Sequence, residues 1–389
     1  MQDASTSIGR LTLQEGLRGT DNALGVIRLA LASLVIFSHA FYLGGWGGDP
    51  TIRWTQGQAT IGELAVIGFF IVSGYLITKS GTRIDIIQFM WHRILRIFPA
   101  YLTVLVVSAA VVGPAIWLAM GRPYGDYWTR GADGPLSYVV GNAGLEIHQW
   151  GIHDIFVSTT PYGGAFNGSL WTLAYEWRAY LIIATLVLVG ALKRMPSAVV
   201  GAAAVTYLAA AAYYFRLGLF GELWPSLASK ETITLTLAFL IGGTMAVWSR
   251  RILLDGRAAA ATAVIAAVTL FTNGWVLLGY PAFAYTLFFV AARLPGWWRR
   301  IGSRNDYSYG MYVYGFLVQQ ITAYLGWYRW GYVPWVVTTI AITAVCAYAS
   351  WHGVEKHALH LKGKGPGLGY RYWFARTRAM RFGSAAPTV

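Results

Sequence analysis

The chain has 389 residues, of which 56% are hydrophobic and only 12% are charged. Soluble domains carry about 25% charged residues, so this composition excludes a soluble globular protein and indicates a protein embedded in a bilayer. The single cysteine, Cys346, excludes an intramolecular disulfide and a cysteine-based metal cluster.

Apolar segments long enough to cross a bilayer recur along the chain. We predict an all-α, polytopic membrane helix bundle of about ten transmembrane helices with no soluble domain. The first span begins too far from the N-terminus, and is too long, for a cleaved signal peptide. The predicted organisation is a cytoplasmic N-terminal segment (about residues 1–23), a transmembrane domain (24–355) and a basic cytoplasmic tail (356–389). The predicted spans cover roughly residues 24–44, 60–79, 99–120, 169–192, 196–214, 232–249, 258–273, 275–293, 309–327 and 332–351.

The net charge of +14 is distributed unevenly between the two sides of these spans. With the N-terminus in the cytoplasm, 22 of the 30 Lys and Arg residues fall in cytoplasmic segments, 6 fall outside, and Arg28 and Arg178 lie within spans. This asymmetry is the positive-inside signature. The basic charge therefore indicates orientation and attraction to anionic lipid, and not nucleic-acid binding. We predict a multi-pass protein of the inner (plasma) membrane with both termini in the cytoplasm and a tail that is a disordered basic end.

The first predicted span carries Arg28 and, eleven residues later, His39. Eleven residues turn a helix by about 1,100°, within about 20° of three full turns, so the two side chains share one face roughly 16 Å apart. Ionisable groups inside a membrane are costly and suggest function. The alternative is that Arg28 extends to the surface and His39 only hydrogen-bonds a neighbouring helix.

Two further motifs belong to the predicted cytoplasmic half of the membrane. In "GFFIVSGYLITKS", small residues that include Ser73 let a helix or a slender ligand come close. In "WHRILRIFPAY", Arg93 and Arg96 are three residues apart and share a helix face. Two guanidinium groups so placed suit a phosphate, although they could equally be ordinary positive-inside anchors.

The fourth span opens with "NGSLWTLAYEWRAY", which places Glu176 at a depth similar to that of His39. A buried carboxylate needs a partner. Arg178 lies about 200° around the helix from Glu176 and is a poor partner, so His39 is the nearest candidate by depth. His148 and His153, in the outward connection before this span, are a poor metal set, and we expect no metal site.

Together these motifs resemble the membrane acyltransferase-3 family, which O-acylates glycans and some other hydroxyl compounds. The resemblance covers most of the chain. Two departures are visible: Gly315 and Phe316 stand where many members have a histidine, and the extracytoplasmic esterase-like domain of many members is absent. We therefore expect no essential role for Gly315 or Phe316. We also expect that the same polypeptide does not pass the acyl group on in a second transfer step. The matching elements are Arg28 with His39, "GFFIVSGYLI", Arg93 with Arg96 and "IFPAY", "NGSLWTLAYEW", "YSYGMYVYGF" and "SWHGVEKH".

The resemblance implies a cytoplasmic acyl-coenzyme A donor, most commonly acetyl-coenzyme A, and no permanently bound cofactor. Arg93 and Arg96 would hold the phosphorylated nucleotide, with Arg28 and Ser73 along the donor's path. His39 would be the general base. Glu176 would orient the His39 ring, as the acid does in a Ser-His-Asp triad.

The acceptor would be a hydroxyl of an extracytoplasmic or lipid-linked glycan. Asn167, Ser169 and Trp171, at the outer end of the fourth span, are the candidate acceptor-binding residues. Glu355 and Lys356, at the inner end of the tenth span and so on the other side from these residues, are kept only as weak support, because their simplest interpretation is a surface ion pair of little energetic value. Two alternatives stay open: acylation of a small hydroxyl metabolite, and a non-enzymatic glycolipid transporter that uses Arg28, His39 and Glu176 as its path. Transporters usually show inverted repeats, and the sequence shows none.

Reporter fusions test the predicted orientation. Because the charge asymmetry places both ends in the cytoplasm, a reporter fused to the C-terminus should be active only if it is of the cytoplasmic type. Activity of a periplasmic-type reporter at that position would contradict the topology. It would also remove Arg93 and Arg96 from the side that supplies the donor.

Overall fold

The computed structural model describes residues 11–19, 21–129, 131–215 and 229–382. Over these residues the fold is all-helical, without a named strand, which confirms the predicted fold class. The principal helices are α2 (Leu24–Leu43), α4 (Ile61–Gly81), α5 (Ile86–Val107), α6 (Gly113–Ala119), α9 (Thr172–Leu188), α11 (Ser197–Tyr214), α12 (Lys230–Val247), α13 (Gly256–Thr272), α14 (Tyr280–Arg293), α16 (Ser308–Tyr324) and α17 (Tyr332–Ser350). The shorter α-helices are α1 (Leu13–Gly16), α3 (Thr51–Trp54), α7 (Tyr124–Tyr127), α8 (Pro135–Asn142), α10 (Ala191–Arg194), α15 (Gly296–Arg299), α18 (Lys356–Leu359) and α19 (Gly369–Phe382).

A helix occupies the position of each predicted span, and seven helical segments of the described chain are long and apolar enough to cross a membrane. The protein is therefore a multi-pass membrane protein, but the count of ten is not confirmed. Three of the helices at predicted spans, α9, α13 and α16, have only 17 residues each. A span of hydrocarbon takes about 20 residues, so helices of this length fall short by almost one turn.

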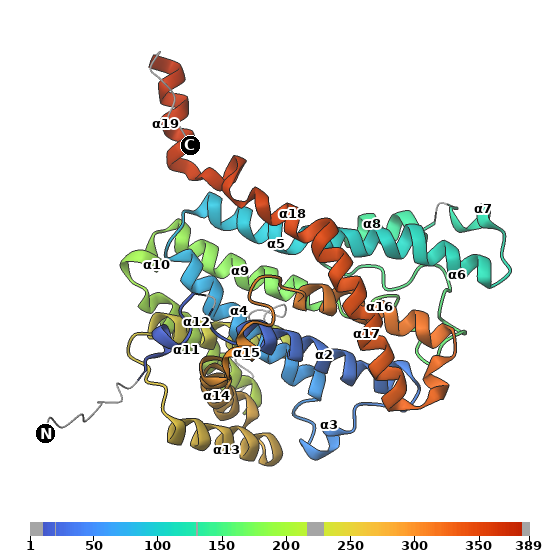
Figure 1. The fold of residues 1–389 in the computed structure, drawn as a ribbon, viewed down its shortest axis with the longest axis horizontal. Helices are drawn as coiled ribbons and strands as arrows, with labels where there is room; N and C mark the ends of the chain where they lie inside the picture. Colours follow the sequence, from blue (N-terminus) through green and yellow to red (C-terminus); the bar gives the residue numbers. More distant parts are fainter. Residues whose placement is uncertain (1–10, 20, 130, 216–228, 383–389) are drawn as a thin grey trace, which may run out of the picture.

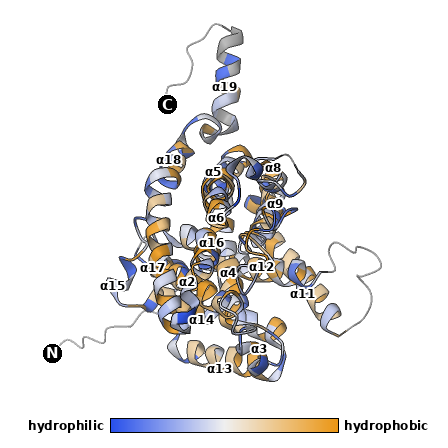
Figure 2. Cartoon of the chain, turned by 90° about the vertical axis from the view of Figure 1, so that its right-hand side faces the viewer, coloured by the Kyte–Doolittle hydropathy of each residue, from blue (hydrophilic) through white to orange (hydrophobic). Residues whose placement is uncertain are grey.

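Helix α4 lies at the centre of the bundle, packed against α2, α9, α12 and α14, while α16 packs between α2 and α17. In Figure 1, α10 and α19 lie towards one end of the long axis, and α6 and α7 lie at the other. Large apolar side chains stay exposed on the outer helices, such as Leu208 (66%), Val264 (62%) and Val345 (69%). Figure 2 shows the same apolar colouring along the outer helices of the bundle. An aqueous surface rarely carries so much apolar area, whereas lipid tails accept it.

The third predicted span begins earlier than expected. Asp85 caps α5 in a capping box with Gln88, and the helix then runs through Pro99 and a π-helical turn (Ser108–Val112) into α6. Arg93 and Arg96 therefore lie within the first half of a continuous helix, on the rigid scaffold. Capping supplies the partners that the first backbone N–H groups lack, which explains why this helix starts at the charged end of its sequence.

The predicted disordered tail is wrong as far as Phe382. After α17, a π-helical turn (Trp351–Glu355) leads into α18, two 3-10 turns and α19, which projects from the body of the protein (Figure 1). The first ten residues of the predicted N-terminal segment and residues 383–389 of the predicted tail lie outside the described residues.

Two glycines bring the backbones of α4 and α12 into contact. A Cβ atom at Gly74 would lie 1.8 Å from the carbonyl oxygen of Phe239, and one at Gly242 would lie 1.9 Å from that of Ile71. Real Cβ atoms do not approach backbone so closely, so each position requires glycine. Small residues of this kind let membrane helices pack by van der Waals contact.

This crossing predicts that Gly242→Ala destabilises the bundle. The added methyl group must push α4 and α12 apart, and overpacking costs about 1–3 kcal/mol, so the unfolding temperature in detergent should fall. Gly201→Ala on α11 is the control, because a Cβ there meets no atom within 4 Å. It should keep or raise the unfolding temperature, since alanine favours a helix over glycine by up to about 1 kcal/mol. Equal unfolding temperatures for Gly242→Ala and the wild type would contradict the proposed role of Gly242.

Candidate functional site

Two cavities lie side by side in the bundle, one at each end of the Arg28–His39 face of α2. The residues Val66, Thr172 and Tyr312 line both and form the wall that they share. A hydrogen bond joins the hydroxyls of Thr172 and Tyr312 across this wall. We name the first the arginine cavity; its polar lining is Arg28, Ser73, Arg93, Arg96, Glu176, Tyr180, Ser308, Tyr309 and Lys362. We name the second the histidine cavity; its polar and aromatic lining includes Ser38, His39, Tyr42, Gln58, Glu63, Trp171, Tyr214, Lys230, Glu231, Trp275 and Tyr280.

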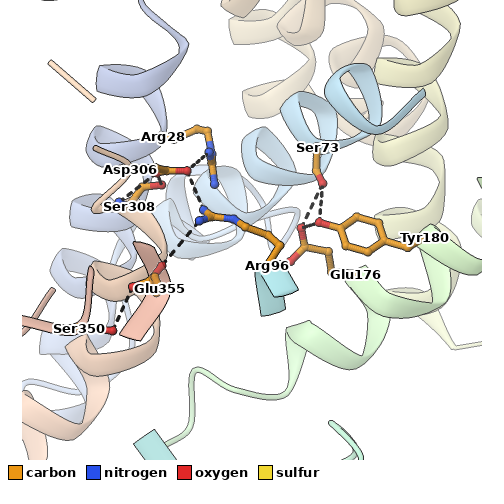
Figure 3. A network of polar contacts seen from close by, with 9 residues as sticks. All are labelled: Arg28, Ser73, Arg96, Glu176, Tyr180, Asp306, Ser308, Ser350 and Glu355. Carbon is orange, nitrogen blue, oxygen red and sulfur yellow. Dashed lines mark hydrogen bonds and ion pairs between the residues drawn. The ribbon is translucent and has the colours of Figure 1, made fainter. Parts of the chain in front are cut away.

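A carboxylate holds two of the predicted arginines together beside the arginine cavity (Figure 3). Asp306, in the loop before α16, forms ion pairs with Arg28 and with Nη2 of Arg96, the latter at 2.6 Å. Nη1 of Arg96 also lies 3.6 Å from Oε2 of Glu355. The network ties α2 and α5 to the loop before α16 and to the turn after α17, so it fixes the positions of both arginines.

Asp306 was not predicted as a site residue. Its Oδ1 accepts hydrogen bonds from the hydroxyl of Ser308 at 2.5 Å and from the backbone N–H of Ser308 at 3.3 Å, so it also holds the first residue of α16. Burial alone would raise the pKa of Asp306, but Arg28 and Arg96 outweigh it and hold the pKa well below its usual range. In the sequence, Asp306 is only an aspartate two residues before a helix, a position where aspartate is common. Nothing in this pattern predicts that Asp306 binds two arginines.

Glu176 and Ser73 meet in the arginine cavity. Oε1 of Glu176 accepts a hydrogen bond from the Ser73 hydroxyl at 3.0 Å and another from the hydroxyl of Tyr180. The predicted pairing of Glu176 with His39 is wrong for this structure, because within the described residues Nδ1 of His39 has no hydrogen-bond partner and Glu176 lines the other cavity. The sequence suggested this pair only because Glu176 and His39 lie at a similar depth in the membrane. In the structure, Glu176 contacts Ser73 and Tyr180, whereas His39 contacts Phe316.

Arg93 differs from its neighbour Arg96. Its guanidinium lies 5.7 Å from the ring centres of both Phe89 and Tyr180. Its Nε is buried without a hydrogen-bond partner, and no ion pair involves it among the described residues. The two arginines that the sequence treated as one clamp therefore have different environments: Arg96 forms ion pairs with Asp306 and Glu355, whereas Arg93 forms none among the described residues and lies beside Tyr180 and Glu176.

His39 lines the histidine cavity. Its ring stands edge-to-face against Phe316, with ring centres 5.4 Å apart. Gly315 and Phe316 stand where many members of the resembled family have a histidine, and here the apolar ring of Phe316 packs against His39. Its Nδ1 is buried and has no hydrogen-bond partner within the described structure.

The three predicted acceptor residues separate into two groups. Trp171 lines the histidine cavity. Asn167 and Ser169 are buried and line neither cavity. Nδ2 of Asn167 donates to the carbonyl of Val313 at 2.8 Å, which holds α16 in place. The structure therefore gives Asn167 a packing role beside α16, and an acceptor role for Asn167 and Ser169 stays a prediction.

The geometry thus presents a cavity lined by four cationic side chains beside a cavity that holds a histidine. The sequence pattern of the family described as "Acyltransferase domain" matches residues 21–352. The chain belongs to the membrane acyltransferase-3 family. This acyltransferase is 27% identical to an "O-acetyl transferase" of Shigella phage Sf6 over 357 residues, which cover 87% of the chain and 96% of the relative. It is 26% identical to "Nodulation protein 10" of Rhizobium leguminosarum bv. viciae over 369 residues, or 88% and 95% of the two chains. No solved structure matches it.

Membership of this family identifies the acyltransferase as an enzyme that acylates hydroxyl groups. It therefore decides against the transporter alternative that the sequence left open. The matched residues contain Arg28, His39, Arg93, Arg96, Glu176 and Asp306, so both cavities belong almost wholly to the family domain. Lys362 lies outside the match.

The ion-pair network predicts that Asp306→Asn destabilises this acyltransferase. The change leaves two partly buried guanidinium groups without their common counter-ion, and loss of one partner of a buried pair costs about 3 kcal/mol. Thermal unfolding of the purified protein should show the loss. Asp21→Asn is the matched control, because Asp21 is 83% exposed and pairs with Arg299 at 3.3 Å, and exposed pairs are worth less than about 1 kcal/mol. Equal losses in both variants would argue against the network.

Proposed function

We propose that the enzyme transfers an acyl group, most simply acetyl, from acyl-coenzyme A to a hydroxyl of a glycan, with His39 as the general base. One observation carries the proposal: the cation-lined cavity and the cavity of His39 share a wall made by Val66, Thr172 and Tyr312. A donor bound by its phosphates in the first cavity would have its thioester directed towards the second. Binding that aligns the two reactants supplies much of the rate enhancement of a bimolecular transfer.

The arginine cavity suits the donor. Four cations line it, namely Arg28, Arg93, Arg96 and Lys362, against the one carboxylate of Glu176. Phosphate groups bind such clusters through charge-assisted hydrogen bonds, which are about twice as strong as neutral ones. The lining also contains apolar side chains, with Phe69, Phe70 and Ile97 among them, and apolar surface suits the narrow pantetheine arm.

The histidine cavity suits a sugar hydroxyl. Aromatic rings of Tyr42, Trp171 and Trp275 line it together with the polar side chains of Gln58 and Glu63. Binding sites commonly combine apolar area with a few placed polar groups in this way. The same lining would also accept a small hydroxyl metabolite, which we keep as the second candidate acceptor.

The proposed reaction needs one proton acceptor and no metal. His39 takes the proton from the acceptor hydroxyl as its oxygen attacks the thioester carbonyl carbon. The tetrahedral adduct collapses with cleavage of the carbon–sulfur bond, and the departing sulfur takes the proton back from the imidazolium. The products are the O-acyl ester and coenzyme A, so atoms and charge balance. A general base contributes about 10²–10⁴-fold to such a step.

Glu176 has a different role in this proposal from the one that the sequence suggested. It holds Ser73 and the hydroxyl of Tyr180 at the side of the arginine cavity, so it shapes the donor's path and does not orient His39. For the membrane, we propose the plasma membrane with the arginine cavity facing the cytoplasm, in keeping with the positive-inside charge distribution. The bilayer and the two substrates are then the partners of the chain.

The His39→Gln variant tests the base directly. Glutamine keeps the size and hydrogen bonding of the side chain but cannot accept a proton near neutral pH, so turnover should fall by about 10²-fold or more. The measurement is acyl transfer from acetyl-coenzyme A to the acceptor by purified enzyme, with thermal unfolding as a check of folding. His148→Gln is the control, because the side chain of His148 is 67% exposed and lines neither cavity. Near-normal turnover by His39→Gln would leave His39 as a structural residue.

A further inference from the structure

Lys362 reaches the arginine cavity from a part of the chain beyond the family match. That match ends at residue 352, whereas Lys362 lies on the 3-10 turn His360–Gly363 and lines the cavity. We propose that Lys362 completes the binding site for the phosphates of the donor nucleotide, and that Arg93 is its partner on α5. The inference rests on the proposed function, because it names the part of acyl-coenzyme A that these two residues hold.

The segment that carries Lys362 is fastened along the first turns of α5, the helix that carries Arg93. We call residues 361–370 the C-terminal strap. Figure 1 shows the chain at α18, just before the strap, beside α5. The fastening hydrogen bonds are Trp91 Nε1 to the Leu361 carbonyl (2.9 Å), His92 Nε2 with the Lys362 carbonyl (3.2 Å), Gln88 Nε2 to the Gly367 carbonyl (3.0 Å) and Tyr370 N–H to Asp85 Oδ2 (3.0 Å). The strap and the start of α5 therefore form one unit with two cations at its cavity side.

Two glycines, Gly367 and Gly369, determine the backbone path of the strap. A Cβ atom at Gly367 would lie 1.8 Å from the carbonyl oxygen of Lys362, and one at Gly369 would lie 2.2 Å from Oδ2 of Asp85. Gly369 also has φ +82°, which L-residues rarely adopt. The chain thus turns back tightly behind Lys362 and is held against the cap of α5. This close approach gives Lys362 a defined position that a free tail would not provide.

The ion pairs decide which cations are available to an anion. Asp306 and Glu355 already neutralise Arg28 and Arg96. Arg93 and Lys362 both line the cavity and form no ion pair among the residues that the structure describes, although Tyr180 and the carboxylate of Glu176 lie beside Arg93. A cation in such a site is stabilised by a counter-ion with several acceptor oxygens, and a phosphate supplies three. Lysine and arginine together suit this ligand, because lysine supplies a point charge and arginine a directional fork.

The experiment compares donors with and without the nucleotide. Lys362→Gln in the full-length purified enzyme should weaken coenzyme A binding about tenfold, which corresponds to about 1.4 kcal/mol, and should raise the KM for acetyl-coenzyme A by a similar factor. The KM for acetyl-pantetheine, which lacks the nucleotide phosphates, should not change. Lys364→Gln is the matched control: it lies two residues further along the strap, is exposed and does not line the cavity. It should leave both constants unchanged.

A second measurement uses the unmodified enzyme, so it does not depend on how a variant folds. Coenzyme A or adenosine 3′,5′-bisphosphate should slow the reaction of Lys362 with an amine-specific reagent several-fold, as followed by mass spectrometry, and leave the rate at Lys364 unchanged.

The outcomes separate this inference from the proposed function. If the wild type binds neither coenzyme A nor the bisphosphate, the proposed donor site fails. If the wild type binds coenzyme A while Lys362→Gln binds it equally and Lys362 is not protected, only the role of Lys362 is overturned. Equal weakening for acetyl-coenzyme A and acetyl-pantetheine would also overturn it, because the residue would then act on the whole donor or on the fold.

Discussion

The shared carboxylate of Asp306 is the interaction on which the site depends. Two guanidinium groups from α2 and α5 approach one acid, and their mutual repulsion would separate these helices without it. Because Glu355 binds Arg96 from the turn after α17, the same network also fixes the chain just before the C-terminal strap. One acid in a short loop therefore sets the spacing of the helices that enclose the arginine cavity.

The network divides the cations of the arginine cavity by function. The carboxylates of Asp306 and Glu355 form ion pairs with Arg28 and Arg96, so the main role of these two arginines is structural. They hold in place the helices that line the arginine cavity. In the proposed donor site, Arg93 and Lys362 are the cations that bind the phosphates. A site in which every cation was paired would bind an anion only by breaking ion pairs. One in which none was paired would carry four mutually repelling charges. The observed arrangement limits both costs, because structural and ligand-binding charges lie on different residues.

The sequence predicted the features that are local to one helix. Composition gave the all-helical membrane bundle, and helical geometry placed Arg28 and His39 along one face, where they now line adjacent cavities. It did not predict contacts between helices. Depth in the membrane fixes only one coordinate, so Glu176 was assigned to His39 although it binds Ser73 and Tyr180. Asp306 and Lys362 were missed for the same reason: nothing near either residue in the sequence points to its partner, which lies hundreds of residues away.

The wall between the cavities defines what the transfer requires. Thr172 and Tyr312 are joined by a hydrogen bond, and Val66 completes the wall beside them. If the donor binds by its phosphates at Arg93 and Lys362, the acyl group must pass this wall to meet a hydroxyl at His39. A short acyl group needs little displacement of three side chains, whereas the extra methylenes of a longer one must be accommodated between packed helices, and such overpacking costs about 1–3 kcal/mol. On the proposed function, the packing around Val66, Thr172 and Tyr312 would therefore favour acetyl over longer acyl groups, and it would do so at the wall, away from the residues proposed to hold the donor's charge.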